Sequence, residues 1–170
     1  MTTPPTLLER SDARLDLDLD LAHAARHLAY RPASWRNAVR FDSQARTYTR
    51  IPLPEENGYE AWLLTWLPGQ GTGLHDHAGS AGAFVVVDGV LTEHTAEQDL
   101  EGRTTLHSRA RGTGEVRVFG THHVHDVQNE HGAPAVSIHV YAPSLAAMNR
   151  YELTAGRLVT VRHDRAGIDW

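Results

Sequence analysis

Residues 69–77 read Gly-Gln-Gly-Thr-Gly-Leu-His-Asp-His and place His75 and His77 two positions apart. In a strand, residues i and i+2 point to the same face, so this spacing predicts two imidazoles projecting together from one side of a sheet. Neighbouring imidazoles are a typical pair of metal ligands. In a chain with 12 histidines, the other interpretation is two ordinary polar residues.

The composition restricts what else a metal site could contain. The 170 residues include no cysteine, which excludes disulfides, cysteine-based zinc sites, iron–sulfur clusters and a cysteine nucleophile. The chain has 16 basic and 21 acidic residues, a formal net charge of −5, without the basic excess that binding to nucleic acid requires. No apolar run approaches the roughly 20 residues of a membrane span, and the N-terminus lacks a signal-peptide pattern. We expect a cytoplasmic protein without a nucleic acid or membrane partner.

The N-terminal part is predicted to be helical. Residues 1–14 carry no motif, and 15–30 are expected to form a helix that ends at Arg31-Pro32, because a residue before proline is disfavoured in helical conformation. A second short helix is expected over 34–40 with Ser34 as its N-cap. The apolar stripe of the first helix consists of Leu17, Leu21, Ala24, Ala25 and Leu28.

From residue 47 onward the pattern is typical of strands. Short segments rich in Val, Leu, Trp, Tyr and Thr alternate with Gly, Pro, Asn and Asp, which predicts an antiparallel sandwich or barrel. Asp88-Gly89 is a signal for a hairpin with a type I′ turn. We expect one mainly β domain over 1–170, with a tail and helices at 1–46 and a barrel at 47–170. The predicted strands cover 48–53, 60–67, 83–87, 90–94, 115–119 and 135–141.

The spacing of glycines and histidines resembles the two motifs of the cupin superfamily. The first motif is matched by Gly69, His75, His77, position 82 and Gly89. The second is matched by Gly114, Gly120, His122, His125 and Asn129. The resemblance implies a small jelly-roll β-barrel with a metal bound by His75, His77 and His125. Position 82, where many cupins have a glutamate ligand, is glycine. A slip in strand register would put His122 in place of His125.

Longer motifs resemble the cysteine dioxygenase family of thiol dioxygenases within the cupins. They are Tyr48-Thr49-Arg50, Trp66, Leu74-His75-Asp76-His77 with Ser80, residues 87–93 with Glu93, residues 125–129, and Ser137-Ile-His139-Val-Tyr141-Ala-Pro143. The resemblance spans roughly 48–143 and implies Fe(II) as the cofactor, and a small thiol, L-cysteine, and O2 as the substrates. Trp66 is interpreted as a core residue without a chemical role.

Ser137, His139 and Tyr141 are also informative without the resemblance. At positions i, i+2 and i+4 of a strand they lie in a row and can form a relay from hydroxyl to imidazole to phenol. The other interpretation is a solvated outer face, with Ile138 and Val140 buried. We expect the inward relay, which would orient Tyr141 as a catalytic group.

Arg50 and Tyr48 are the expected substrate-binding residues. In the family an arginine at this place holds the carboxylate of cysteine, and homologues that prefer 3-mercaptopropionate carry glutamine there. Arg46 would compete for the role if the alignment shifts. Mammalian-type enzymes join a cysteine at the place of Gly82 to the tyrosine equivalent to Tyr141; without cysteine, this chain cannot form that thioether, and we expect open space beside Gly82.

The sequence therefore predicts an Fe(II)-dependent thiol dioxygenase that converts L-cysteine to cysteine sulfinic acid, as a monomer or a homodimer. Two alternatives stay open: a dioxygenase for another small thiol such as 3-mercaptopropionate, and a noncatalytic metal-binding module. A cupin barrel alone does not choose between them, because the fold carries many unrelated functions.

Overall fold

A computed structural model describes residues 20–54 and 58–169 of the chain. The described part is mainly β, as predicted, and every strand pairing in it is antiparallel. The largest sheet has five strands in the order β1-β2-β8-β3-β6. Their bounds are β1 Thr47–Ile51, β2 Glu60–Trp66, β8 Ala135–Ala142, β3 Ala81–Asp88 and β6 Val116–Phe119.

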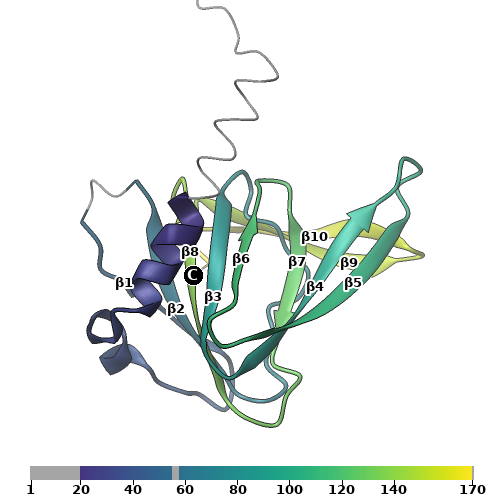
Figure 1. Cartoon of the computed structure of the whole chain (residues 1–170). Helices are drawn as coiled ribbons and strands as arrows, with labels where there is room; N and C mark the ends of the chain where they lie inside the picture. Colours follow the sequence, from purple (N-terminus) through teal and green to yellow (C-terminus); the bar gives the residue numbers. More distant parts are fainter. Residues whose placement is uncertain (1–19, 55–57, 170) are drawn as a thin grey trace, which may run out of the picture.

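Two smaller sheets complete the β structure of the described residues, and each includes a hairpin whose tip extends away from the five-stranded sheet (Figure 1). One has the order β5-β4-β7, with β5 Thr104–Gly112, β4 Val90–Gln98 and β7 Val124–Gln128; the other pairs β9 Ala147–Thr154 with β10 Arg157–Arg165. The sequence pattern does not predict β5, β7, β9 or β10. β5 and β10 are mostly exposed, so they lack the apolar alternation that marks a half-buried strand.

The inner face of the five-stranded sheet packs against the three-stranded sheet. Their contact is a cluster in which Phe84 and Trp66 from the large sheet meet Leu91 of β4 and Val127 of β7, all at most 1% exposed. Each strand contributes alternate residues to this interior. The cavity described below lies at one end of the cluster.

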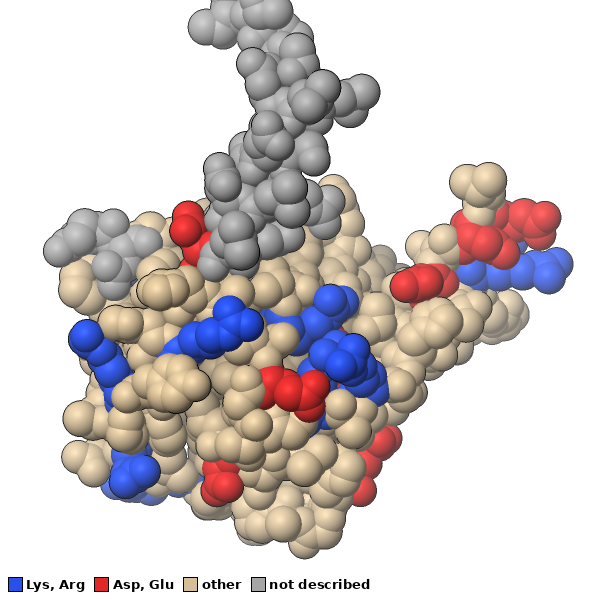
Figure 2. Space-filling model, in the orientation of Figure 1, with Lys and Arg blue, Asp and Glu red and all other residues tan. Residues whose placement is uncertain are grey.

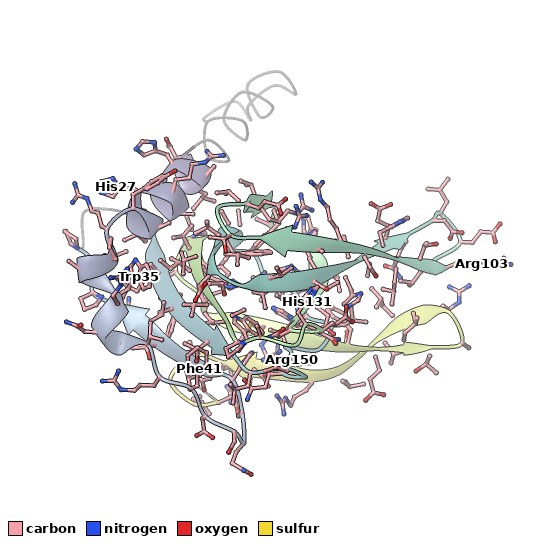
Figure 3. The ribbon with its side chains drawn as sticks, turned by 60° about the horizontal axis from the view of Figure 1, so that its bottom comes forward. His27, Trp35, Phe41, Arg103, His131 and Arg150 are labelled. Carbon is pink, nitrogen blue, oxygen red and sulfur yellow. The ribbon has the colours of Figure 1, made fainter. Side chains whose placement is uncertain are left out.

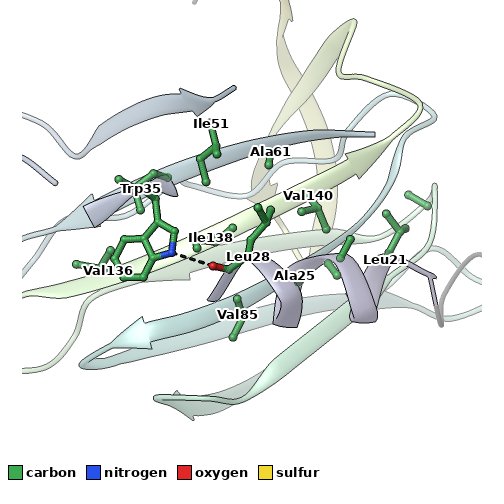
Figure 4. Packing of buried hydrophobic residues seen from close by; sticks show 14 residues of the cluster. Leu21, Ala25, Leu28, Trp35, Ile51, Ala61, Val85, Val136, Ile138 and Val140 are labelled. Atoms are coloured by element: carbon green, nitrogen blue, oxygen red, sulfur yellow. Dashed lines mark hydrogen bonds between the residues drawn. The ribbon is translucent and has the colours of Figure 1, made fainter. Parts of the chain in front are cut away.

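The outer face of the same sheet is covered by an α-helix over residues 20–29. Leu21, Ala24, Ala25 and Leu28 are buried against Ile138 and neighbouring side chains (Figure 4), which confirms the predicted stripe except for Leu17, which lies outside the described residues. The helix therefore makes both faces of β8 buried.

The second predicted helix is wrong. Residues 32–38 form two 3₁₀ turns, η1 Pro32–Ser34 and η2 Arg36–Ala38. Ser34 Oγ donates to Arg31 O at 2.8 Å instead of capping a helix. Trp35, with φ −140°, separates the two turns, and its indole Nε1 donates to Leu28 O at 2.9 Å, which anchors the segment to the first helix (Figure 4).

The predicted hairpin at Asp88-Gly89 is also wrong. β3 and β4 belong to different sheets and do not pair, so these residues form a corner where the chain crosses from one sheet to the other. Only Gly89 has a positive φ, at 79°, whereas a type I′ turn needs two. A Cβ on Gly89 would lie 2.7 Å from Pro134 O; glycine is required for this close approach as well as for the turn.

Charged groups of both signs are interspersed on the face shown in Figure 2, in line with the moderate net charge. Among the described residues, none of the helices has the length and apolar character needed to cross a bilayer.

Candidate metal centre and substrate pocket

The structure brings His75, His77 and His125 together. One ring nitrogen from each lies within 4.8 Å of the others, and all three residues are buried. His125 is on β7. His75 and His77 lie between β2 and β3 in an irregular segment, so the prediction of a regular strand there is wrong. His75 nevertheless pairs with His125 as in a sheet, because each backbone N–H donates to the other's carbonyl, at 2.9 and 3.0 Å.

Hydrogen bonds to the outer ring nitrogens orient two of these imidazoles. His75 Nδ1 lies 2.9 Å from Gly73 O and His125 Nδ1 lies 3.1 Å from Glu93 Oε1, which leaves both Nε2 atoms free to bind an ion. Both ring nitrogens of His77 are buried and have no hydrogen-bond partner among the described residues. Buried polar atoms are rarely left unpaired, so a metal ion fits this position.

Burial keeps the three imidazoles neutral. It lowers the pKa of His75 and His77 well below the usual range, with a further contribution from neighbouring imidazoles, and it lowers the pKa of His125. Neutral imidazole is the form that binds metal ions. Three such ligands leave coordination positions open, as catalytic metal sites require.

Glu93 contacts the outer ring nitrogen of His125, Nδ1. Its carboxylate contacts His125 and also His123 Nε2 at 3.2 Å, Arg111 Nη2 at 2.7 Å and Arg117 Nε at 3.3 Å. Burial opposes ionisation, but the hydrogen bonds from both imidazoles and from Arg111 outweigh it and hold the pKa of Glu93 far below its usual range. Glu93, His123 and His125 are also close enough to hold an ion, but two guanidinium groups already neutralise the carboxylate. His122 is exposed.

Phe119 fills the space beside Gly82. A Cβ on Gly82 would lie 2.5 Å from Phe119 Cζ and 2.9 Å from Val140 O. The expectation of open space at this position is therefore wrong: the ring occupies the place that a glutamate or cysteine side chain would need. Gly82 is also the strand partner of Tyr141, so the ring packs beside the phenol, with centroids 6.2 Å apart.

The predicted row on β8 faces the interior. Ser137 Oγ lies 2.9 Å from His139 Nε2, and Tyr141 Oη lies 3.4 Å from His139 Nδ1. All three side chains are buried. Burial lowers the pKa of His139 to about 3 and raises the pKa of Tyr141 above its usual value, so both groups are neutral near pH 7.

Trp66 extends this row. Its indole Nε1 donates to Ser137 Oγ at 2.9 Å, although its sequence context predicts only a core residue. The order of contacts is therefore Trp66, Ser137, His139, Tyr141. The contact between Trp66 and Ser137 follows from the pairing of β2 with β8, which places Trp66 opposite Ala135 and Leu64 opposite Ser137. Only knowledge of this pairing could have revealed the contact.

A cavity of about 240 Å³ opens onto the imidazoles of His75 and His125, and it is lined by His139 and Tyr141 as well. This is below the roughly 300–1,000 Å³ of pockets for drug-sized ligands. Apolar walls come from Leu64, Val127 and Met148. The cavity therefore suits a small molecule that contacts the metal centre and the relay together.

Arg46 is the arginine that faces this cavity without an ion-pair partner among the described residues. Its Nε is buried and has no hydrogen-bond partner in that part of the chain. The guanidinium lies 5.7 Å from the ring centroids of Tyr48 and Trp66. Burial, then repulsion from Arg150, lowers its pKa, but an arginine stays charged near neutral pH. A partly buried guanidinium without an ion-pair partner is a ready site for an anion.

Arg50 lies elsewhere. Its side chain is 65% exposed and its Nη2 lies 3.5 Å from Glu60 Oε2, beside a different depression. Tyr48 does line the cavity, and its side chain is 44% exposed. Of the two predicted substrate-binding residues, the structure brings only Tyr48 to this cavity.

Arg150 is a second cationic group on the cavity wall. It lies among the side chains near the middle of the molecule, unlike Arg103 at the hairpin tip (Figure 3). Its Nε donates to Asp164 Oδ2 at 2.7 Å and its Nη1 to Thr72 O at 3.0 Å. Asp164 also accepts a hydrogen bond from Arg162 Nη2 at 3.1 Å, so two guanidinium groups share this carboxylate, whereas Arg46 forms no ion pair among the described residues.

Solved structures share the fold. The TT1209 protein of Thermus thermophilus matches with a TM-score of 0.54 and 21% identity, over 64% of this chain and 93% of that one. A recombinant oxalate oxidase in complex with glycolate matches with a TM-score of 0.54 and 17% identity, over 64% of this chain and 56% of that one. At these identities the likeness concerns the fold alone, which is that of a cupin, as predicted.

Sequence comparison gives a narrower result. Cysteine dioxygenase type 1 of Bos taurus is 27% identical over 148 residues, 81% of this chain and 72% of the bovine protein. The Danio rerio protein of the same name is 27% identical over 140 residues, 77% of this chain and 68% of that one. The family model described as cysteine dioxygenase type I matches residues 9–154. Because this match covers most of the chain, the protein belongs to the cysteine dioxygenase type I family.

Proposed function

We propose that the protein is a thiol dioxygenase that uses Fe(II) and O2 to oxidise L-cysteine to cysteine sulfinic acid. One observation carries the proposal: the small cavity is lined by the neutral imidazoles of His75 and His125, two members of the three-histidine cluster, and by Arg46, which has no ion-pair partner among the described residues. A ligand that fits must bring a metal-binding group to one end and an anion to the other. Family membership adds the reaction class.

His75, His77 and His125 would hold the iron. Their neutral nitrogens suit a divalent transition metal, and three ligands leave room for small molecules. When bound, iron(II) would supply the redox chemistry with O2 and lower the pKa of a thiol that coordinates it. The surrounding chain keeps the ligands neutral and fixed in orientation.

Arg46 would bind the substrate carboxylate. A planar guanidinium donates two parallel hydrogen bonds to a carboxylate, and Arg46 forms no ion pair among the described residues, whereas Arg150 is paired with Asp164. This assignment moves the role predicted for Arg50 to Arg46, four residues earlier. Tyr48 would flank the bound carboxylate at the cavity edge.

Tyr141 would contact the reacting end of the substrate, held in place by His139 and Ser137. The reaction adds both atoms of O2 to the sulfur: the thiol RSH and O2 give the sulfinic acid RSO2H, which needs no external reductant. Negative charge on oxygen is stabilised by a fixed hydrogen-bond donor. The apolar walls exclude bulk water from the sulfur, which strengthens these polar contacts.

The test is oxygen uptake by the Fe(II)-loaded protein with L-cysteine, with mass spectrometry of the product made under ¹⁸O2. We expect sulfinate that carries two ¹⁸O atoms. A panel with 3-mercaptopropionate and cysteamine identifies the preferred thiol, because the first lacks the amine and the second lacks the carboxylate. Stoichiometric iron binding without oxygen uptake on any thiol would contradict the enzyme and favour a noncatalytic module.

A further inference from the structure

The direction of the hydrogen bonds along β8 decides what Tyr141 can do. If Tyr141 donates its proton to His139, it offers the cavity only a lone pair. If it accepts from His139, its own proton is free for a ligand in the cavity. The choice depends on which nitrogen of His139 carries the hydrogen, and the contacts at the far end of the row, at Trp66, determine that choice.

An indole N–H can only donate. Trp66 Nε1 lies 2.9 Å from Ser137 Oγ, so Ser137 accepts this hydrogen bond through a lone pair. The hydroxyl proton of Ser137 then needs an acceptor of its own. Ser137 is fully buried, and its other side-chain partner among the described residues is His139 Nε2, at 2.9 Å. The hydroxyl proton therefore has an acceptor only if Nε2 is unprotonated.

The opposite arrangement is costly. If His139 Nε2 carried a hydrogen, two N–H groups would converge on Ser137 Oγ, and the buried hydroxyl proton would have no acceptor. Leaving a buried donor unpaired disfavours that tautomer by roughly tenfold or more. His139 is a neutral imidazole, so it has one N–H to place.

We propose that Trp66 is a positioning residue that sets the polarity of the whole row. Its N–H directs the Ser137 hydroxyl onto Nε2 of His139, which places the hydrogen of His139 on Nδ1. His139 then donates to Tyr141 Oη, across 3.4 Å. Tyr141 is left with a phenolic O–H that points to no acceptor in the described residues and is available to a ligand in the cavity.

For catalysis, this inference rests on the proposed function. A Tyr141 that donates can stabilise negative charge that develops on oxygen or sulfur, whereas a Tyr141 that accepts would oppose it. Trp66 itself does not line the cavity. It acts through Ser137 and His139 rather than by contact with substrate.

The tautomer of His139 is the direct test, and it needs no turnover. The full-length protein, labelled with ¹⁵N-histidine and loaded with Zn(II) to avoid paramagnetism, gives two-bond ¹H–¹⁵N correlations that distinguish Nδ1–H from Nε2–H. The His139 signals are those that disappear in His139→Gln. We expect the Nδ1–H form in the wild-type protein; the Nε2–H form there would overturn the proposal even if no variant folds.

Two matched variants separate polarity from packing. Trp66→Phe removes the donor and opens space for water. The fraction of His139 in the Nε2–H form should therefore rise from under about a tenth to a value similar to that of the Nδ1–H form. Trp35→Phe loses an indole hydrogen bond of the same length, to Leu28 O on the other face of the sheet, and should leave the tautomer unchanged. An unchanged tautomer in Trp66→Phe would show that Trp66 does not set the polarity.

Kinetics distinguish this inference from the proposed function. With Fe(II), we expect Trp66→Phe to lower kcat about tenfold or more with little change in KM, and Trp35→Phe to match the wild-type protein. A wild-type protein that oxidises no thiol would refute the proposed function, while the tautomer measurement would still decide the polarity.

Discussion

Gly82 and Phe119 are strand partners across β3 and β6, and the phenyl ring lies over the glycine so closely that a Cβ would be 2.5 Å from Cζ. The ring also stacks on His77, with centroids 4.9 Å apart. Phe119 therefore takes up the room that a side chain at position 82 would need, and it forms one wall of the metal centre. In this chain the space beside Gly82 is filled by the ring of Phe119 and is not open.

Gly82→Ala should destabilise the protein by about 1–3 kcal/mol, because the methyl group would overlap Phe119 and the Val140 carbonyl. Chemical denaturation gives the free energy of unfolding. Gly112→Ala is the matched control, since a Cβ there would meet only Glu115 Oε2 at 3.6 Å. The cost in Gly82→Ala should shrink in a Phe119→Leu background; equal costs in both backgrounds would contradict the overlap.

Arg46→Gln should raise KM for L-cysteine by about 10-fold to 100-fold, the usual effect of losing a hydrogen bond to a charged group. It should change KM for cysteamine, which has no carboxylate, by less than about twofold. Arg50→Gln is the control, because Arg50 is exposed and paired with Glu60, and both KM values should stay near those of the wild-type protein. A larger rise in KM for L-cysteine in Arg50→Gln than in Arg46→Gln would contradict this assignment and favour Arg50, the residue that the sequence motif indicates.

The difference between Arg46 and Arg50 illustrates a limit of spacing arguments. Both lie on the same side of the chain as Tyr48, at intervals of two residues, so periodicity alone treats them alike. Which of them meets the cavity depends on which end of β1 lies nearer to the metal ligands. That position results from the pairing of β1 with β2 and of β2 with β8, contacts between segments far apart in the sequence.

β8 shows both what the pattern predicts and where it fails. Ser137, His139 and Tyr141 were expected to share a face, and they do. The alternation could not identify the inner face, because the helix over residues 20–29 buries Ile138 and Val140 as completely as the barrel buries the polar row. The hairpin predicted at Asp88-Gly89 does not form for a similar reason: local turn chemistry does not determine which strands pair.

Glu93→Gln should weaken metal binding by about 10-fold to 100-fold, as is usual when a carboxylate that orients a metal-bound histidine is lost. The amide still contacts His125 but no longer fixes its tautomer by charge, and Arg111 loses its buried counter-ion. Competition with a chelator measures the affinity for Zn(II) or Fe(II). Glu101→Gln, in an exposed ion pair with Arg103, is the control. An affinity equal to the wild-type value would contradict a supporting role for Glu93.

The metal-free protein should lose stability as the pH falls from 7 to 5. Buried His139 has a pKa of about 3 in the folded chain, against about 6.5 when unfolded. Between these values the unfolded state binds the extra proton, so acidification favours unfolding, and His139 alone contributes about 2 kcal/mol between pH 7 and 5. His75 and His77, whose pKa values burial also lowers, add to the same trend.

Urea denaturation of the metal-free protein at pH 7 and pH 5 measures this loss. His139→Gln should reduce the difference between the two pH values by about 2 kcal/mol, because glutamine takes up no proton. Trp35→Phe, which lowers stability without removing a titratable group, should show the full difference. If His139→Gln retains the wild-type pH dependence, the imidazole is not held neutral by burial, and the relay from Ser137 to Tyr141 would have to carry a charge.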